Sequence, residues 1–439
     1  MSDSSSRLAV VGTGYVGLTT GACFAHMGHQ VVCADVDHAK VEMLRAGEIP
    51  IVEQGLEEIV RDASDAGRLE FVLGAAAAVE DADIVFLCVP TPQGEDGRAD
   101  LSYIEKAAAE IAPLLAPGAV VVNKSTVPVG STTAVERVLQ RDDVTVVSNP
   151  EFLREGTAVA DFLRPERVVI GSADRAAAQR VADLYGGIDT RMIITDPASA
   201  ETIKYAANGF LAMKISFVNA VAAMCEHVGA DVAAVVDGIG SDSRIGDRFL
   251  NPGPGWGGSC FPKDSRALVR IAEQHGYDFS MMRGVISVND EQRRRMIDKI
   301  AKAVGNHPSD LSGVRVGALG LTFKAGTDDR RESPAVAIIR DLIGVGAMVR
   351  AYDPTTVDEL GTSDDGDLAG VEVVATAAEV TSEADVICVF TEWPEFAELD
   401  LEDFAARLAP GTPVVDTRNL FEPSEVKAVG LRYDGVGRR

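Results

Sequence analysis

Residues 8–35 read LAVVGTGYVGLTTGACFAHMGHQVVCAD, and this stretch decides the fold. Leu8–Val11 is a short apolar run, a glycine-rich turn follows at Gly12–Gly17, and a helical pattern continues to Gly28. The next apolar run, Val31–Asp35, ends in an acid. A strand, a turn, a helix and a second strand in this order predict a βαβ unit with parallel strands.

Two unbroken apolar runs continue this pattern further along the chain. They span Asp83–Val89 and Ala119–Val122. Strands that are apolar on both faces are typical of a parallel sheet covered by helices on both sides. We therefore expect a Rossmann-like, doubly wound α/β domain that closes before residue 200.

The glycine spacing between the first strand and the first helix is typical of a dinucleotide-binding turn. Gly12 allows the tight turn, Gly14 lets the backbone approach a pyrophosphate, and Gly17 allows the helix to pack closely on the strand. The N-terminus of the helix would then supply N–H donors to the phosphates. The alternative is a glycine-rich turn that binds nothing, and the strand and helix around it favour the dinucleotide site.

Asp35 selects among dinucleotides. It ends the second strand, near the position about 20 residues on where an acid accepts a hydrogen bond from the ribose 2′-hydroxyl. Because a carboxylate repels a 2′-phosphate at this position, we expect NAD rather than NADP. Asp37 lies beyond the strand end and is expected to cap the next helix instead.

The pattern changes to helical spacing between Asp196 and Gly229. Asp196 is a suitable N-cap, Pro197 suits the first helical position, and Gly229 can end the helix. Such a helix is on the order of 45 Å long, which is enough to join two domains. Further helical sequence continues from Asp264 to about Val304.

The last third of the chain repeats the order of the first. Val314–Gly320 and Met348–Asp353 resemble the first two strands, Asp385–Thr391 echoes residues 83–89, and Leu408–Val415 echoes residues 115–122. We therefore expect two Rossmann-like doubly wound domains joined by a central helical domain that contains the long connecting helix. The expected domain limits are 1–195, 196–308 and 309–439.

The composition is that of a folded protein with an acidic surface. The chain has 439 residues, 46% of them hydrophobic and 25% charged, and a formal net charge of −26. This charge argues against a nucleic acid or an anionic membrane as partner, because both would be repelled. A salt-rich cytoplasm and simple compositional drift remain alternative origins of the acidic excess.

Neither the N-terminal segment nor the longest apolar stretch predicts targeting to a membrane. The start, Met1–Ser6, lacks a basic segment followed by an apolar one, so it does not resemble a signal peptide. The longest apolar stretch, Phe210–Cys225, is interrupted by Lys214 and Asn219. We expect no membrane span and a cytoplasmic protein.

Cys260 differs from the other five cysteines. Those five lie in apolar runs and show no metal-binding spacing, so we expect them to be buried thiols and expect no metal site. Cys260 instead lies in the polar segment GGSCFPKD, residues 257–264, just before a helical stretch. A helix N-terminus and a neighbouring Lys263 both lower a thiol pKa, which favours a nucleophile over a structural cysteine in a glycine turn.

Four further polar residues are ordinary when taken singly. Lys204 and Asn208 lie one helical turn apart and share a face, as solvated pairs often do. Thr126 lies in KSTVPVG and Glu151 in NPEFLREG, where a strand-end hydroxyl and a helix-start acid need no function. Single positions leave their roles open.

Taken together, these segments resemble the UDP-glucose/GDP-mannose dehydrogenase family. The shared motifs are GxGYVG, STVPVG, NPEFLREGTA, the Lys204/Asn208 helix, GGSCFPKD and FKAGTDDRRES, in the family's order and over nearly the whole chain. GGSCFPKD after Pro252–Trp256 resembles most the branch that acts on UDP-glucose. Trp256 stands where Tyr or Phe is usual, which keeps an aromatic residue there. UDP-N-acetylmannosamine, UDP-N-acetylgalactosamine and GDP-mannose remain alternative substrates.

The resemblance implies an organisation and a chemistry. The first domain would bind NAD, the last would bind the nucleotide of the sugar, and the long helix would form a homodimer core. A C6 hydroxyl would be oxidised by NAD to an aldehyde, which Cys260 would attack. The thiohemiacetal would lose a second hydride to give a thioester, and hydrolysis would release the uronate.

The resemblance also implies individual roles. Lys204 would stabilise the oxyanion, and Asn208 would donate a hydrogen bond to it. Asp264 and Thr126 would orient a water molecule, and Glu151 would be the general base. The implied cofactor contacts are Gly12, Gly14, Tyr15, Val16, Gly17, Asp35, Lys40, Thr91, Thr126, Glu155, Lys263 and Arg331. The implied substrate contacts are Glu151, Phe152, Leu153, Lys204, Asn208, Arg244 reaching across the dimer interface, Phe249, Gly257, Phe323 and Lys324.

Two other classes of protein share this plan. A two-electron dehydrogenase, such as a 6-phosphogluconate-type or hydroxyacyl enzyme, needs no thiol nucleophile, so Cys260 argues against it. A non-catalytic sugar-nucleotide-binding protein would be expected to have lost Cys260, Lys204 or Asp264, and all three are present.

Overall fold

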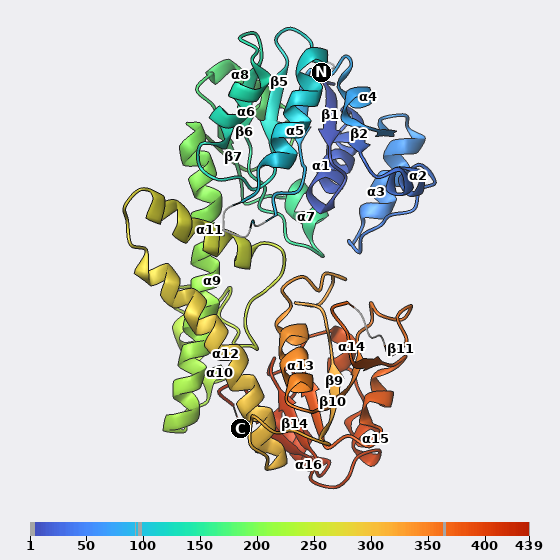
Figure 1. The fold of residues 1–439 in the computed structure, drawn as a ribbon, viewed down its shortest axis with the longest axis vertical. Helices are drawn as coiled ribbons and strands as arrows, with labels where there is room; N and C mark the ends of the chain where they lie inside the picture. The colour runs from blue at the N-terminus through green and yellow to red at the C-terminus, as the bar shows by residue number, and fades with distance from the viewer. Residues whose placement is uncertain (1–4, 93, 95–98, 363–365, 439) are drawn as a thin grey trace. The chain divides into compact units, whose positions relative to one another are not determined.

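The computed structural model describes residues 5–92, 94, 99–362 and 366–438. The chain forms two compact units, Met1–Ala207 and Asn208–Arg439. In Figure 1 the first unit is coloured blue to green and the second green to red. The helix α9 (Pro197–Val228) begins in the first unit and ends in the second.

The first unit is built on one sheet. Its strands are β1 (Arg7–Val11), β2 (Gln30–Asp35), β3 (Leu69–Leu73), β4 (Ile84–Leu87), β5 (Val120–Asn123), β6 (Thr145–Ser148), β7 (Arg167–Gly171) and β8 (Arg191–Thr195). Their order is β3-β2-β1-β4-β5-β6-β7-β8, and the pairs are parallel apart from β6 with β7. The chain runs outward to β3 and returns beside β1, which confirms the predicted doubly wound sheet. The crevice where the order reverses, between β1 and β4, is where such sheets bind ligands.

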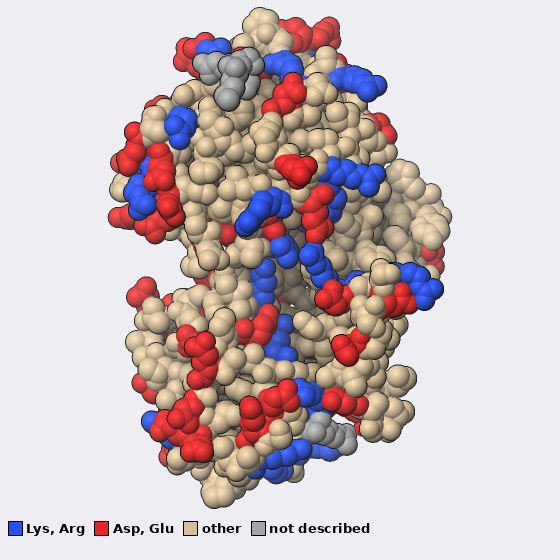
Figure 2. All heavy atoms as spheres, turned by 180° about the vertical axis from the view of Figure 1, so that it is seen from behind, with Lys and Arg blue, Asp and Glu red and all other residues tan. Residues whose placement is uncertain are grey.

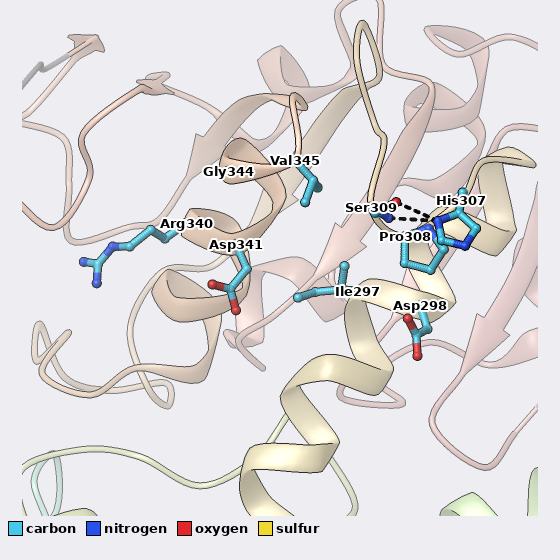
Figure 3. A pocket seen from close by; sticks show the side chains of 9 residues that line it. All are labelled: Ile297, Asp298, His307, Pro308, Ser309, Arg340, Asp341, Gly344 and Val345. Atoms are coloured by element: carbon cyan, nitrogen blue, oxygen red, sulfur yellow. Dashed lines mark hydrogen bonds between the residues drawn. The ribbon is translucent and has the colours of Figure 1, made fainter.

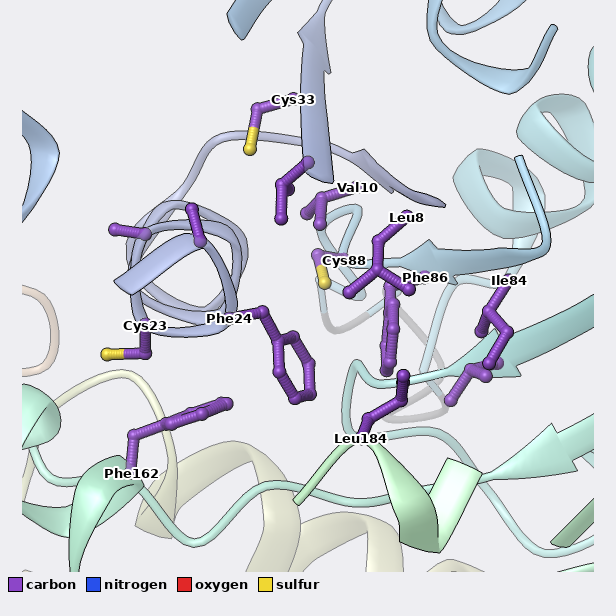
Figure 4. Packing of buried hydrophobic residues seen from close by; sticks show 14 of the residues in the cluster. Leu8, Val10, Cys23, Phe24, Cys33, Ile84, Phe86, Cys88, Phe162 and Leu184 are labelled. Carbon is purple, nitrogen blue, oxygen red and sulfur yellow. The ribbon is translucent and has the colours of Figure 1, made fainter. Parts of the chain in front are cut away.

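The helices of this unit enclose an apolar core. They are α1 (Tyr15–His26), α2 (His38–Arg45), α3 (Leu56–Asp65), α4 (Ala75–Val79), α5 (Ser102–Ile111), η1 (Ala112–Leu114), α6 (Ser131–Leu139), α7 (Ala158–Leu163) and α8 (Arg175–Asp183). Phe24 of α1 lies 5.2 Å from the ring of Phe86 and 5.0 Å from that of Phe162 (Figure 4). Cys23, Cys33 and Cys88 are buried in the same cluster, as the sequence predicts.

The long helix α9 has the predicted ends. The Asp196 carboxylate accepts a hydrogen bond from Ser199 N at 2.8 Å, Pro197 is the first helical residue, and Gly229 follows with φ +77°. Among the described helices, α9 is also the one that is long and apolar enough to cross a membrane by length and composition. In its most apolar window, 44% of the residues are buried inside the protein.

Three more helices complete the central part: α10 (Val232–Gly240), α11 (Phe261–Gln274) and α12 (Ser280–Val304). The predicted helical stretch to Val304 is therefore correct in type, but it is interrupted after Gln274. Gly276 adopts φ +75° there, which ends α11 and lets the chain turn into α12.

The second unit carries a second sheet. Its strands are β9 (Arg315–Leu319), β10 (Met348–Tyr352), β11 (Gly361–Thr362), β12 (Val371–Val373), β13 (Val386–Val389), β14 (Pro413–Asp416) and β15 (Arg432–Gly435). Its later helices are α13 (Pro334–Gly344), η2 (Ala377–Thr381), α14 (Pro394–Ala397), α15 (Leu401–Ala406) and α16 (Pro423–Ala428). The strand order of this sheet is β11-β12-β10-β9-β13-β14-β15. Its central part, β10-β9-β13-β14, corresponds to β2-β1-β4-β5 of the first sheet. The predicted repeat is confirmed.

Acidic side chains are spread over the surface of each unit. Figure 2 shows them scattered on the visible face, with Lys and Arg interspersed. This distribution accounts for the net charge of −26 without a single large acidic patch on that face.

Candidate active site

The three glycines of the first turn each lack a side chain for a different structural reason. Gly12 has φ +98°, and a Cβ there would lie 2.7 Å from the carbonyl oxygen of Cys88. A Cβ on Gly17 would collide with the carbonyl oxygen of Gly12. Gly14 faces open space and is the N-cap of α1, with no side chain capping the helix. An open glycine at an uncapped helix N-terminus fits the pyrophosphate of a dinucleotide.

Asp35 ends β2 beside this turn. One oxygen accepts hydrogen bonds from Thr13 N at 2.9 Å and Thr13 Oγ1 at 2.6 Å, and Lys40 Nζ lies 3.5 Å away. Burial opposes ionisation, but the hydrogen bonds from Thr13 and Asp37 and the charge of Lys40 hold the pKa of Asp35 below its ordinary value. The side chain is therefore an anion next to the turn. Asp37 caps α2 through Ala39 N and Lys40 N, as predicted.

Glu151 and Lys204 form a buried ion pair in the first unit. Lys204 Nζ lies 2.8 Å from Glu151 Oε1, and each side chain is 4% exposed. The other carboxylate oxygen accepts a hydrogen bond from Leu153 N at 2.6 Å. Burial disfavours the charge of Glu151, but Lys204 outweighs it and holds the pKa of Glu151 below its usual range. The predicted base is thus ionised and able to accept a proton.

Phe152, in the loop that carries Glu151, contacts two cations, Arg167 of β7 and Lys204 of α9. The guanidinium carbon of Arg167 is 3.8 Å from the ring centroid, and Lys204 Nζ is 5.4 Å from it. Such cation–π contacts restrain the ring. Two predicted substrate contacts, Phe152 and Leu153, are therefore held in place together with Glu151.

Thr126 lies in a loop that is anchored at both ends. Its carbonyl oxygen accepts a hydrogen bond from Thr91 Oγ1 at 2.9 Å. Further along, the buried carboxylate of Glu201 accepts hydrogen bonds from Gly130 N at 2.6 Å and Thr132 N at 3.0 Å. Glu201 lies on α9, three residues before Lys204, so the same helix face anchors the Thr126 loop and the Glu151 loop.

In the second unit, Cys260 is the N-cap of α11 and is partly exposed. Its Sγ lies 3.6 Å from Ser259 Oγ. The glycines before it allow close approach: a Cβ on Gly257 would collide with the carbonyl oxygen of Glu332, and Gly258 (φ +79°) packs against the Phe323 ring. The structure thus places the thiol at a helix N-terminus, where a thiolate is favoured.

Asp264 connects two other predicted residues of this unit. Its side chain is fully buried in the first turn of α11. Asn208 Nδ2 donates to one carboxylate oxygen at 2.6 Å, and Lys263 Nζ donates to the other at 2.6 Å. Asn208, Lys263 and Asp264 therefore form one hydrogen-bonded group.

Three family models match consecutive parts of the chain. The NAD binding domain of the UDP-glucose/GDP-mannose dehydrogenase family matches residues 6–189, its central domain matches 198–291, and its UDP binding domain matches 317–423. The chain belongs to the UDP-glucose/GDP-mannose dehydrogenase family. NAD is accordingly the cofactor of the first domain, as predicted.

Individual relatives span the whole chain. A UDP-glucose 6-dehydrogenase of Rhizobium meliloti is 44% identical over 98% of this chain and 99% of its own length. The UDP-glucose 6-dehydrogenase TuaD of Bacillus subtilis is 43% identical over 98% of this chain and 93% of its own. Among solved structures, a UDP-glucose dehydrogenase from Pyrobaculum islandicum has a TM-score of 0.90 at 37% identity, covering 99% of this chain and 98% of that one.

Four predicted family contacts of the second unit are exposed or partly exposed. Arg244 is 87% exposed and bonds Asp242, and Arg331 is 65% exposed and bonds Asp329. Lys324 Nζ lies 5.6 Å from the ring centroid of Phe323. Phe249 has φ +63°, and its ring lies 6.2 Å from that of Phe261. The Arg244 and Arg331 side chains are therefore largely exposed to solvent while each pairs with a nearby aspartate.

Two hydrogen-bond networks involve polar residues, among them Glu53 and Lys124, for which the sequence predicts no role. The Tyr15 hydroxyl donates to Glu53, and Gly156 N donates to Glu53 at 2.7 Å, so this carboxylate joins the glycine-rich turn to the loop after Glu155. Burial and Glu53 raise the pKa of Tyr15. Lys124 Nζ donates to Asn149 Oδ1 at 3.0 Å and to the Tyr185 hydroxyl at 3.1 Å, just before the Glu151 loop. Glu53 and Tyr185 lie outside every quoted motif, and their partners are distant in sequence.

A pocket of about 700 Å³ lies elsewhere in the second unit. Its lining includes Asp298 of α12, Asp341 of α13 and His307 (Figure 3). No predicted site residue lines it. Within the described ranges, no group of three or more His, Cys, Asp or Glu side chains is arranged to hold a metal ion.

Proposed function

We propose that this protein oxidises the C6 hydroxyl of UDP-glucose to the carboxylate of UDP-glucuronate with two molecules of NAD. The observation that carries the proposal is the thiol of Cys260 at the N-terminus of α11, four residues before the buried Asp264. The names of relatives that are 41–44% identical along the chain support UDP-glucose as the substrate.

The proposed reaction has four steps. The C6 hydroxyl loses a proton and a hydride to become an aldehyde. The Cys260 thiolate then adds to the aldehyde carbon, forming a C–S bond and an oxyanion. Loss of a second hydride from the same carbon gives a thioester. Water attacks the thioester, and the C–S bond breaks to release the carboxylate and the thiolate. NAD, when bound, accepts both hydrides.

The side chains have separate proposed roles. Lys204 and Asn208 stabilise the oxyanion, and both lie on one face of α9. Glu151 is ionised and accepts the proton of the attacking water. Asp264 and Thr126 orient that water. Lys204 balances the charge of Glu151 until the substrate oxygen provides a second anion.

The cofactor contacts are a proposal as well. Gly12, Gly14 and Gly17 with the start of α1 would hold the pyrophosphate, and Asp35 would accept a hydrogen bond from a ribose hydroxyl. The other proposed contacts are Tyr15, Val16, Lys40, Thr91, Thr126, Glu155, Lys263 and Arg331. For the sugar nucleotide they are Glu151, Phe152, Leu153, Lys204, Asn208, Arg244, Phe249, Gly257, Phe323 and Lys324.

We further propose a homodimer built on α9. Phe210, Phe217, Met224 and Val228 are each more than half exposed. Their spacing of seven, seven and four residues places them on one stripe of the helix. In a dimer with two-fold symmetry, this stripe would pack against the same stripe of a second copy of the chain. Arg244 is exposed and would reach the partner's substrate site.

The remaining expectations also stay proposals. The domain limits 1–195, 196–308 and 309–439 agree in order with the three family models. A cytoplasmic location is supported by the free, buried thiols, which suit a reducing compartment.

The deciding assay follows NAD reduction with a panel of UDP- and GDP-sugars. UDP-glucose should give two NADH per molecule consumed, and NADP should be used far less well because Asp35 repels its phosphate. Faster turnover of UDP-N-acetylmannosamine, UDP-N-acetylgalactosamine or GDP-mannose would reassign the substrate. Equal or better use of NADP would contradict the role of Asp35.

A further inference from the structure

The loop before Cys260 has a buried backbone but belongs to no sheet. Residues 252–258 are buried, and they connect the end of the α10 region to the start of α11. A buried backbone needs partners for its N–H and C=O groups. Here side-chain amides of two helices supply them.

Three amide residues hold this loop. Gly253 N donates to Asn219 Oδ1 of α9 at 2.8 Å, and Gln292 Nε2 of α12 donates to Gly253 O at 2.7 Å. Asn289 of α12 makes a reciprocal pair with Trp256: its Oδ1 accepts from Trp256 N at 2.8 Å, and its Nδ2 donates to Trp256 O at 3.0 Å. At Asn289 a single uncharged amide supplies both the acceptor and the donor that the Trp256 backbone needs.

Further contacts restrain the backbone between these hydrogen bonds and Cys260. The Trp256 indole N–H donates to Ser216 Oγ at 2.9 Å, which anchors the side chain as well. Gly255 adopts φ +131°, and a Cβ there would lie 2.9 Å from Asn289 Oδ1. Gly257 and Gly258 then pack against residues 332–334 and the Phe323 ring. Cys260 follows only two residues later.

We propose that Asn219, Asn289 and Gln292 are positioning residues, an amide cradle that fixes the Cys260 loop so that the thiol captures the aldehyde before it leaves. The proposal rests on the proposed function. The first hydride transfer does not use the thiol, whereas the second requires the C–S bond. A loosened loop should therefore uncouple the two oxidations.

Asn289→Asp tests the reciprocal pair. The carboxylate can still accept from Trp256 N, but it cannot donate to Trp256 O and repels that oxygen. We expect the NADH formed per UDP-glucose consumed to fall from two toward one, with free aldehyde trapped by hydroxylamine. The kcat for uronate should fall at least tenfold while the KM for NAD stays unchanged. Gln292→Glu should act in the same direction.

The matched control is Gln274→Glu, the same amide-to-acid change at an exposed position near the end of α11. It should leave the stoichiometry at two. Asn289→Ser provides a smaller change should the acid variant fail to fold, and thermal unfolding identifies such failures.

A second readout needs no substrate. The rate at which iodoacetamide alkylates Cys260, followed against pH by mass spectrometry, reports the position and ionisation of the thiol. It should change several-fold in the cradle variants and not in Gln274→Glu. If the wild type is inactive on UDP-glucose but alkylation changes, the proposed function fails and the cradle stands. Unchanged alkylation and stoichiometry in folded cradle variants would overturn the inference.

Discussion

Cys260 occupies the N-cap position of α11, where the partial positive charge of the helix end favours a thiolate. Serine keeps the shape but has a far more basic oxygen, so its adduct should break down poorly. We expect Cys260→Ser to bind UDP-glucose nearly as the wild type does, while sustained turnover falls by several orders of magnitude. NADH formed per substrate consumed, with mass spectrometry of the variant, measures this. Uronate formation near the normal rate would make the thiol structural.

The Glu151–Lys204 pair links the site to stability. Removing one partner of a buried ion pair costs roughly 3–5 kcal/mol, because the other charge stays buried without compensation. Lys204→Met should therefore lower the free energy of unfolding by about that amount at pH 7. In the wild type the pKa of Glu151 is depressed, so the pair stabilises the fold above the unfolded pKa of about 4.3, and this is lost as the pH falls through the folded pKa.

In Lys204→Met the pKa of Glu151 should instead be raised, so the deficit relative to wild type should shrink as the pH falls toward 4. Urea unfolding at pH 7 and at pH 5 tests the sign. The double variant Glu151→Gln/Lys204→Met is the control, since it removes both charges of the pair and should recover most of the stability. A deficit that is independent of pH would contradict the pairing.

At the residue scale, sequence patterns predicted residues in motifs and missed those without one. The turn glycines and Cys260 are marked by their immediate neighbours. Glu53 is not, because its partners Tyr15 and Gly156 lie 38 and 103 residues away. Asn289 likewise meets Trp256 only across 33 residues. Such side chains become visible once the fold brings the segments together.

At the scale of the elements, the exposed apolar stripe of α9 leads to a test of the proposed dimer. Its stripe of Phe210, Phe217, Met224 and Val228 would be costly to leave in water as a continuous surface. Phe217→Glu would place buried charges on the proposed two-fold interface, so we expect a protein with the mass of one chain and much reduced activity. Val357→Glu, at a comparably exposed apolar residue of the second unit, should stay dimeric. A fully active wild-type monomer by light scattering would refute the dimer.

Element types followed from periodicity, and their ends followed from capping residues. Asp196, Pro197 and Gly229 fixed α9 because each has a strong local preference. The break between α11 and α12 was missed, since Gly276 stands in a polar stretch where helix and loop composition overlap. Most strand ends in the structure differ by one or two residues from the ends of the apolar runs. The hydrogen bonds between strands set where a strand ends, and the apolar run does not show them.

At the scale of the whole molecule, the two sheets share the order of their central strands but differ in the surroundings of the aspartate at the end of the second strand of each. Gly320 (φ +95°) follows β9 as Gly12 follows β1, and Asp353 follows β10 much as Asp35 ends β2. Asp35 accepts hydrogen bonds from Thr13 N, Thr13 Oγ1 and Asp37 N, lies 3.5 Å from Lys40 Nζ, and keeps 11% of its side chain exposed. Asp353 is fully buried and accepts from Leu321 N, Thr322 N and the Trp393 indole N–H.

This difference predicts the cofactor stoichiometry. Because Asp353 is fully buried and protein donors already surround it, its carboxylate is not available to a ribose hydroxyl. We therefore expect one NAD per chain by calorimetry, and UDP should not compete for it. Asp35→Ala should weaken NAD binding by about tenfold or more, the loss of a hydrogen bond to a charged group. Asp353→Asn, the matched change in the second unit, should leave NAD affinity unchanged while lowering the unfolding temperature. Two NAD bound per chain, or a loss of NAD affinity in Asp353→Asn, would show that the second sheet binds NAD as well and would contradict this prediction.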